Sequence, residues 1–168
     1  MQSSSIYIAL GSNLPYRDFS PRQLLDSTLK VFESFDISIV AISSFWNSPA
    51  WPDPNQPGYI NAAVQVKTGF SPHDLLSTLH QIESMYGRVR GERWASRSLD
   101  IDLIDYEGRI VRDDPTLELP HPRATQRAFV LLPLQEISSH WRDPETGLQI
   151  EVLINNLDPM DVQAMSKL

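Results

Sequence analysis

The sequence predicts an α+β domain in which an antiparallel sheet carries helices packed on one face. One observation supports this class, and a second indicates the number of domains. Segments with strand-like apolar patterns alternate with two segments of helical spacing, in the order strand-helix-strand-strand-helix-strand. The length of 168 residues suits one hydrophobic core, so we expect residues 1–168 to form a single domain.

The first half of the pattern begins with an apolar strand over residues 5–10, which the turn at 11–13 ends. A helix is expected over 21–35, because apolar side chains recur at helical spacing after Ser20-Pro21, a common helix start. Alternating residues then predict one strand over 37–46.

The second half of the pattern follows a proline-rich loop over residues 48–58, where four prolines exclude regular structure. A strand is expected over 59–67 and a helix over 71–86, opened by a second Ser-Pro pair. An arginine-rich loop over 88–96 precedes a strand over 97–106.

The C-terminal part is expected to add a turn at 107–108, a short strand near Ile110 and a proline-interrupted helix over 123–137. A hairpin over 141–150 and a short terminal helix complete the chain. The whole order predicts a ferredoxin-like βαββαβ arrangement with C-terminal hairpin and helix additions. Such a fold carries no function by itself.

Composition restricts the function. The chain has no cysteine, which excludes disulfides and cysteine-ligated zinc. Its net charge of −7 disfavours nucleic acid as a partner, unless positive charge is locally concentrated. Signal-peptide features and membrane-spanning apolar runs are absent from the sequence, so we expect a soluble cytoplasmic protein with no membrane partner.

Two aspartates in SLDIDLI are the first candidate site. Asp100 and Asp102 alternate with Ile101 and Leu103, so they lie on the opposite face of the strand. Two carboxylates at this spacing could hold one or two magnesium ions, which prefer oxygen ligands. The alternative is a solvated strand face, although aspartate is disfavoured in strands.

The arginine loop is the second candidate site. Arg88, Arg90, Arg93 and Arg97 surround Trp94, a costly residue to expose. Arginine suits bidentate contact with phosphate, so the cluster on an acidic chain indicates one small anionic ligand. A solvated charged loop is the alternative. The chain lacks a GxxxxGK[ST] motif and is therefore no Walker-type NTPase.

Other polar candidates are less specific. His73 and His80 are expected on the surface of a helix, whereas His121 could either pack against a proline or contact phosphate. Tyr59 and Asn61 face the same side of their strand, which suits either core packing or a ligand pocket.

The chain resembles the 6-hydroxymethyl-7,8-dihydropterin pyrophosphokinase family, folate-pathway enzymes that transfer pyrophosphate from ATP. The matching blocks run from YIALGSN through SSFWNSPAW, QPGYINAAV and GRVRGERWASRSLDIDLI to LPHPRATQRAFVLLPL, across about residues 6–137. The stretch from Arg88 to Ile104 is the most specific. Ala95-Ser96 stands where the family usually has Gly-Pro, a departure within the arginine loop.

The resemblance implies a role for each matching residue. Asp100 and Asp102 would hold two magnesium ions and, with Arg90 and Arg97, form the catalytic group. The residues implied to bind ATP are Glu83, Arg88, Arg90, Trp94, Arg97, Leu103, His121 and Arg127. Those implied to bind the pterin are Ser48, Pro49, Trp51, Tyr59, Asn61 and Phe129. The implied partners are these small substrates, and the implied state is a monomer.

Two other functions fit parts of the pattern. A metal-dependent nucleotide hydrolase would use water as the acceptor in place of a pterin. A non-catalytic ferredoxin-like module could instead bind nucleic acid on its sheet, although such a module would want a basic face.

Overall fold

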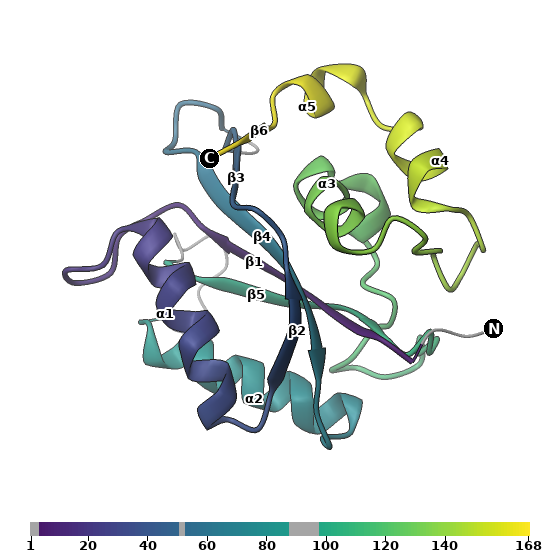
Figure 1. Ribbon diagram of the computed structural model, residues 1–168, viewed down its shortest axis with the longest axis horizontal. Coiled ribbons are helices and arrows are strands. Elements are labelled where there is room, and N and C mark those ends of the chain that lie inside the picture. Colours follow the sequence, from purple (N-terminus) through teal and green to yellow (C-terminus); the bar gives the residue numbers. More distant parts are fainter. Residues whose placement is uncertain (1–3, 51–52, 88–97) are drawn as a thin grey trace.

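A six-stranded antiparallel sheet forms the centre of the computed structural model, which describes residues 4–50, 53–87 and 98–168 (Figure 1). The strands are β1 (Ile6–Ser12), β2 (Ser38–Ile42), β3 (Trp46–Ser48), β4 (Tyr59–Lys67), β5 (Asp100–Tyr106) and β6 (Ser166–Lys167). They pair in the order β5-β1-β4-β3-β6, and β2 also pairs with β4. The antiparallel sheet expected from the sequence is therefore present.

The described residues form five α-helices and one 3₁₀ helix, of which the first two begin within one residue of the predicted positions. They are α1 (Pro21–Ser34), α2 (Pro72–Met85), the 3₁₀ helix η1 (Ala124–Gln126), α3 (Ala128–Ile137), α4 (Ile150–Asn155) and α5 (Pro159–Gln163). Ser20 and Gln23 form a reciprocal capping box at the start of α1, and Ser71 caps α2. Among the described helices, none is long and apolar enough to cross a bilayer.

The prediction of a single strand over 37–46 is wrong, because the structure has two strands there, β2 and β3. Both strands pair with β4, but the register shifts between Ile39 and Ala41. The Ala63 N–H then donates to the Ser43 hydroxyl at 2.9 Å. In a continuous strand, a main-chain carbonyl would accept this N–H. Between the two strands, a side-chain hydrogen bond thus takes the place of one main-chain bond, while the Ser43 N–H still donates to the Ala63 carbonyl.

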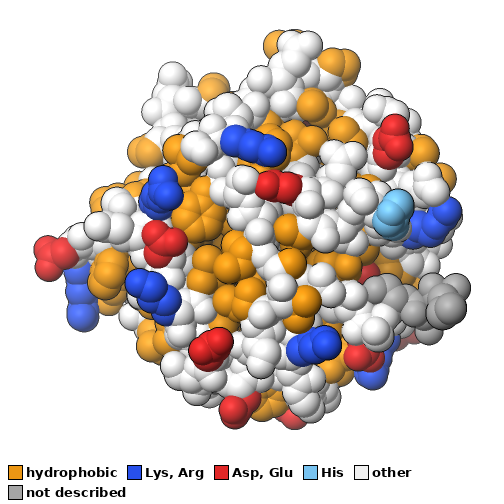
Figure 2. All heavy atoms as spheres, in the orientation of Figure 1, with side chains coloured by type: hydrophobic (Ala, Val, Ile, Leu, Met, Phe, Trp, Pro, Cys, Tyr) orange, Lys and Arg blue, Asp and Glu red, His pale blue; other side chains and the backbone are white. Residues whose placement is uncertain are grey.

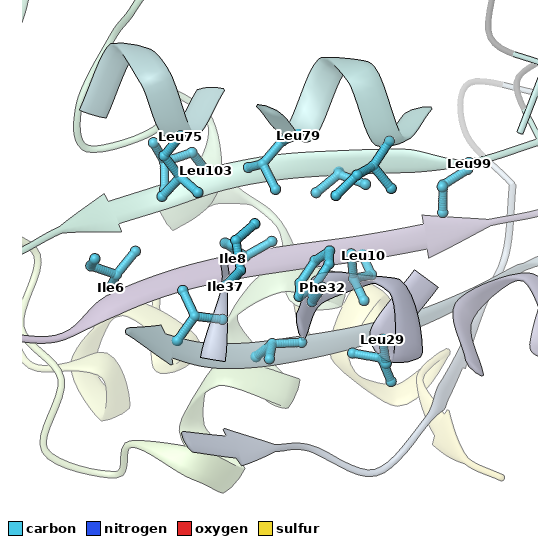
Figure 3. Packing of buried hydrophobic residues seen from close by; sticks show 14 of the residues in the cluster. Ile6, Ile8, Leu10, Leu29, Phe32, Ile37, Leu75, Leu79, Leu99 and Leu103 are labelled. Carbon is cyan, nitrogen blue, oxygen red and sulfur yellow. The ribbon is translucent and has the colours of Figure 1, made fainter. Parts of the chain in front are cut away.

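One face of the sheet packs on α1 and α2, as expected. Figure 3 shows alternate residues of β1, including Ile8, against Phe32 of α1 and Leu79 of α2. The same pattern continues in β5, where Leu103 is buried on this side. Period-two burial in the strands and helical spacing in α1 and α2 therefore build this core.

The prediction that helices pack on only one face of the sheet is wrong for the whole chain. Figure 1 shows α3 and α4 on the opposite side of the sheet from α1 and α2. Tyr7, Ala63 and Ile104 of the sheet are buried there with Leu131 of α3 and Trp141. This second layer leaves the β5 end that carries Asp100 and Asp102 only half-buried.

The segments after β5 are less regular than the sequence predicted. The helix expected over 123–137 is divided, because Arg127 is extended between η1 and α3. Only a bridge between Val111 and Leu119 appears where a strand near Ile110 was expected. The hairpin expected over 141–150 is likewise a turn with one bridge, between Arg142 and Gln149.

Candidate active site

Two carboxylates project from the end of β5, away from the α1–α2 core. Ile101 and Leu103 are buried against that core, while Asp100 and Asp102 lie half-buried on the other face. The alternation predicted from the sequence is therefore confirmed. Within the described residues, no third histidine or carboxylate joins the pair to form a metal-binding group. Two carboxylates suit magnesium, which retains waters and substrate oxygens in its coordination shell.

Glu83 in the last turn of α2 supports the strand that carries this pair. It is fully buried, and its Oε2 accepts the Ile101 N–H at 3.0 Å. Among the described strands, β5 pairs only with β1, so the opposite edge of β5 has no strand partner. On that edge, Glu83 accepts the main-chain N–H of Ile101. This hydrogen bond fixes the backbone between Asp100 and Asp102.

A pocket of about 340 Å³ opens between α2, β5 and the segment 114–122. Glu83, Leu103, Asp102 and His121 all contribute to its wall. The other lining residues are Leu76, His80, Ile101, Asp114, Pro115, Thr116, Leu117, Glu118 and Pro122. A cavity of this size accommodates a small-molecule ligand.

His121 is held between β5 and the loop that follows it. Its backbone N–H donates to the Ile104 carbonyl, and its Nδ1 accepts the Arg123 N–H at 3.2 Å. Nε2 therefore carries the proton of the neutral ring and lies 4.0 Å from Asp102 Oδ1. Burial lowers the pKa of His121, against the opposing effect of Asp102. The site thus presents a neutral N–H donor beside the carboxylates.

Arg127 supplies positive charge on the same side. Burial lowers the pKa of its guanidinium, whereas Asp102 and Asp100 raise it. Arginine remains protonated in proteins, so these interactions place a cation near both carboxylates. Its guanidinium carbon also lies 5.3 Å from the ring centroid of Phe129, at the start of α3.

A second group of side chains lies across β1 from the aspartates. Asn61 is buried on β4, and its Nδ2 donates to Ser48 Oγ of β3 at 2.8 Å. Gly11 is the register partner of both Asn61 and Asp100. A Cβ at Gly11 would lie 3.4 Å from Asn61 Oδ1 and 3.9 Å from Tyr59, so the glycine leaves the floor between the groups open.

Comparison with protein families decides which family this arrangement belongs to. Residues 7–139 match the family model described as 7,8-dihydro-6-hydroxymethylpterin-pyrophosphokinase (HPPK). The chain belongs to the HPPK family. The resemblance inferred from the sequence blocks is therefore confirmed.

Three curated relatives carry the name 2-amino-4-hydroxy-6-hydroxymethyldihydropteridine pyrophosphokinase. The Methylorubrum extorquens protein is 40% identical over 160 residues, covering 94% of this chain and 96% of the relative. The Haemophilus influenzae protein is 37% identical over 148 residues, covering 88% and 89%. The Synechocystis protein is 43% identical over 122 residues, covering 73% of this chain. The match spans only 62% of that relative's length.

Solved structures support the fold. A Plasmodium falciparum HPPK-DHPS structure with STZ-DHP superposes with a TM-score of 0.71 at 14% identity. The match covers 90% of this chain and 42% of that one. At this identity the likeness concerns the fold alone.

The structure describes most of the HPPK site residues predicted from the sequence. Asp100, Asp102, Glu83, Leu103, His121 and Arg127 lie together on one side of β1. Ser48, Tyr59 and Asn61 lie on the other side, and Phe129 lies beside Arg127. Pro49 follows directly after β3. Predicted residues outside the described part of the chain are Trp51, Arg88, Arg90, Trp94 and Arg97.

Sequence reasoning missed one residue of the pocket and the environment of one turn residue. His80 was expected on the helix surface but lines the pocket; its helical spacing with Leu76 and Glu83 was the available signal. Asn13 was expected only as a turn residue. Its Nδ2 donates to the Pro57 carbonyl at 3.4 Å, and its Oδ1 is buried without a partner among the described residues.

Proposed function

We propose that this chain transfers pyrophosphate from ATP to the hydroxymethyl group of 6-hydroxymethyl-7,8-dihydropterin. The products are AMP and the pterin diphosphate, as in folate biosynthesis. HPPK family membership supports this reaction. The observation that best supports the proposal is a row of three register partners across β4, β1 and β5. In this row, Gly11 separates the buried amide of Asn61 from the carboxylate of Asp100.

The aspartate side of the row would bind the nucleotide. Asp100 and Asp102 would hold two magnesium ions, which would offset the negative charge of the ATP phosphates. His121 would donate its Nε2 proton to a phosphate oxygen, and Arg127 would add a positive charge. The nucleoside would occupy the pocket that Glu83 and Leu103 line.

Residues of the arginine loop belong to the same proposal on sequence grounds. Arg90 and Arg97 would stabilise the charge that develops at the transferred group, with Arg88 and Trp94 completing the nucleotide site. They lie outside the described residues, so their part rests on the family motif GRVRGERWASRSLDIDLI.

The asparagine side of the row would bind the pterin. Asn61 would hydrogen-bond the polar edge of the ring, with Ser48 fixing the orientation of its amide. Tyr59 and Phe129 would stack on the two faces of the ring. Pro49 and Trp51 would complete this pocket, the latter on sequence grounds alone.

The proposed reaction is an in-line displacement at the β-phosphorus of ATP. The pterin hydroxymethyl oxygen forms a bond to that phosphorus, and the bond from phosphorus to the α,β-bridging oxygen breaks. AMP leaves, and the hydroxyl proton passes to solvent. Positioning and charge stabilisation provide most of the acceleration in such transfers, and both substrates would be held on one rigid sheet.

We also propose that residues 1–168 act as one monomeric, cytoplasmic pyrophosphokinase domain with a ferredoxin-like frame. The order β5-β1-β4-β2, with α1 after β1 and α2 after β4, supports this frame. Acidic and basic side chains are interspersed on the face seen in Figure 2, which favours small substrates over nucleic acid.

The deciding experiment is incubation with ATP, magnesium and 6-hydroxymethyl-7,8-dihydropterin, following AMP formation. We expect AMP and the pterin diphosphate in equal amounts, and no AMP release without the pterin. AMP release that does not depend on the pterin would indicate the nucleotide hydrolase instead. A salt-sensitive gel shift with RNA and no AMP formation would indicate the nucleic-acid-binding module.

A further inference from the structure

Glu136 in the last turn of α3 joins this helix to the segment between β2 and β3. Its Oε1 accepts the Ser44 N–H at 3.0 Å and the Trp46 indole N–H at 3.1 Å. Its Oε2 accepts the Ser44 hydroxyl at 2.5 Å. Lys167 of β6 lies 3.9 Å from Oε2 and 5.3 Å from the Trp46 ring centroid.

Glu136 is ionised at neutral pH. Partial burial opposes ionisation, but hydrogen bonds from Ser44 and Trp46, with Lys167 nearby, hold the pKa of Glu136 below its ordinary value. Hydrogen bonds to a charged acceptor are stronger than neutral ones. The contact is therefore a firm connection between α3 and the edge of the sheet.

The two parts that Glu136 connects carry the opposite walls of the proposed pterin site. Phe129 lies seven residues before Glu136 on α3, which is about two helical turns along the same side. On the sheet, β3 ends at Ser48, the hydrogen-bond acceptor of Asn61. Ser48 is also the register partner of Tyr59. The position of α3 relative to β3 therefore sets the gap between the Phe129 and Tyr59 walls.

We propose that Glu136 is a positioning residue for the pterin, because it holds the helix that carries Phe129 at a fixed distance from the β3–β4 pair. This inference rests on the proposed function. Glu136 does not line the nucleotide pocket, whose walls come from α2, β5 and residues 114–122. Loosening the contact therefore weakens pterin binding more than nucleotide binding, to which α3 would contribute through Arg127 at its N-cap.

The test compares Glu136→Leu, which removes every hydrogen bond, with Glu136→Gln, which keeps the Oε1 acceptor. Pterin affinity is measured by fluorescence titration in the presence of a non-hydrolysable ATP analogue, and KM is measured for both substrates. We expect Glu136→Leu to weaken pterin binding about tenfold, which corresponds to about 1.4 kcal/mol. We expect Glu136→Gln to restore pterin binding to within about twofold of the original chain, and the KM for ATP to change by less than about twofold in both variants.

Two further variants keep the test decisive. Trp46→Phe removes the indole hydrogen bond and keeps an aromatic ring at this position, and we expect it to weaken pterin binding about threefold even if Glu136→Leu does not fold. Tyr7→Phe is the matched control, because it removes a 2.8 Å hydrogen bond from the sheet to Ser138, directly after α3. That bond does not involve β3, so pterin affinity should be unchanged.

The outcomes separate this inference from the proposed function. An unsubstituted chain that fails to bind the pterin would contradict the proposed function itself. Normal pterin binding by Glu136→Leu and Trp46→Phe would overturn only the role of Glu136. The same role is overturned if the KM values of both substrates rise equally, or if Glu136→Gln is as impaired as Glu136→Leu.

Discussion

Asn61 of β4 and Asp100 of β5 are both register partners of Gly11, so they lie in one row across three strands. Neighbouring strands are about 4.8 Å apart, which places the two backbones about 10 Å from each other. The row links the proposed pterin side and the proposed nucleotide side through main-chain hydrogen bonds. Their relative placement therefore depends on the sheet more than on loops.

Substitution of Gly11 tests whether the open floor of this row is needed. In Gly11→Ala the new Cβ would make ordinary contacts with Asn61 and Tyr59, so the free energy of unfolding should change by less than about 1 kcal/mol. The added methyl group would occupy the floor of the proposed pterin site. We expect at least a tenfold rise in the KM for the pterin, about 1.4 kcal/mol, with the melting temperature as the control. Unchanged pterin affinity would show that the ligand lies elsewhere.

Neutralising either aspartate tests the proposed metal site. Asp100→Asn and Asp102→Asn should each lower turnover by about 10²–10³, or roughly 2.7–4 kcal/mol at the barrier, a range typical of one lost charge-stabilising contact. Both side chains are half-buried beside each other, so the fold should survive. Turnover is measured at saturating ATP and magnesium, with the exposed Asp26→Asn on α1 as a matched control. Near-normal turnover in both variants would exclude a catalytic role for the pair.

Removal of the Ser48 hydroxyl tests the orientation of Asn61. Ser48→Ala leaves the buried Nδ2 of Asn61 without its acceptor, which should lower the free energy of unfolding by about 1–3 kcal/mol. The freed amide should also raise the KM for the pterin and leave the KM for ATP unchanged. Steady-state kinetics with each substrate varied check this split. Asn47→Ala, on the same strand with its side chain on the other face, should affect neither KM.

The buried Asp105 predicts a pH-dependent stability. Burial raises its pKa above 3.8, with nearby Asp143 adding to the effect; hydrogen bonds from Trp141 and Gly108 oppose it. Between the unfolded and folded pKa values the native state binds more protons, so the contribution of Asp105 to stability is lost as pH rises through the folded pKa. The free energy of unfolding of the unsubstituted chain should therefore fall relative to that of Asp105→Asn as pH rises from about 4 to 8. The Asp105→Asn variant becomes the more stable of the two by comparison.

Urea unfolding followed by tryptophan fluorescence at several pH values measures this difference. Both proteins share every other titratable group, so the comparison isolates Asp105. A difference that does not vary with pH would mean that folding does not change the pKa of Asp105.

Local patterns predicted the parts of the fold that depend on neighbours in the sequence. Ser20 and Ser71 cap their helices as expected, because a cap needs only residues within one turn. Asp100 and Asp102 share a strand face because side chains alternate along any strand. The family resemblance implied that Glu83 and His121 bind the nucleotide, and both line the pocket beside Asp102.

The features that sequence reasoning missed depend on contacts between distant segments. Ser43 interrupts a strand because its hydroxyl meets Ala63, twenty residues away. The α3–α4 layer covers the second face because Leu131 and Trp141 find apolar partners on β1 and β5. Residues 114–118 have no helical or strand periodicity in the sequence. Their role as a wall of the pocket is therefore visible only in the structure, where they lie beside α2.

Gly11 and Ala9 occupy the central strand with the smallest side chains available. Their backbones pair with β4 on one side and β5 on the other, and Gly11→Ala would preserve that pairing because the added methyl group makes only ordinary contacts. A cell could therefore accumulate normal amounts of such a variant while lacking its activity. Surveys that rank variants by protein abundance would score Gly11→Ala as tolerated, whereas selection for cell growth would score it as harmful.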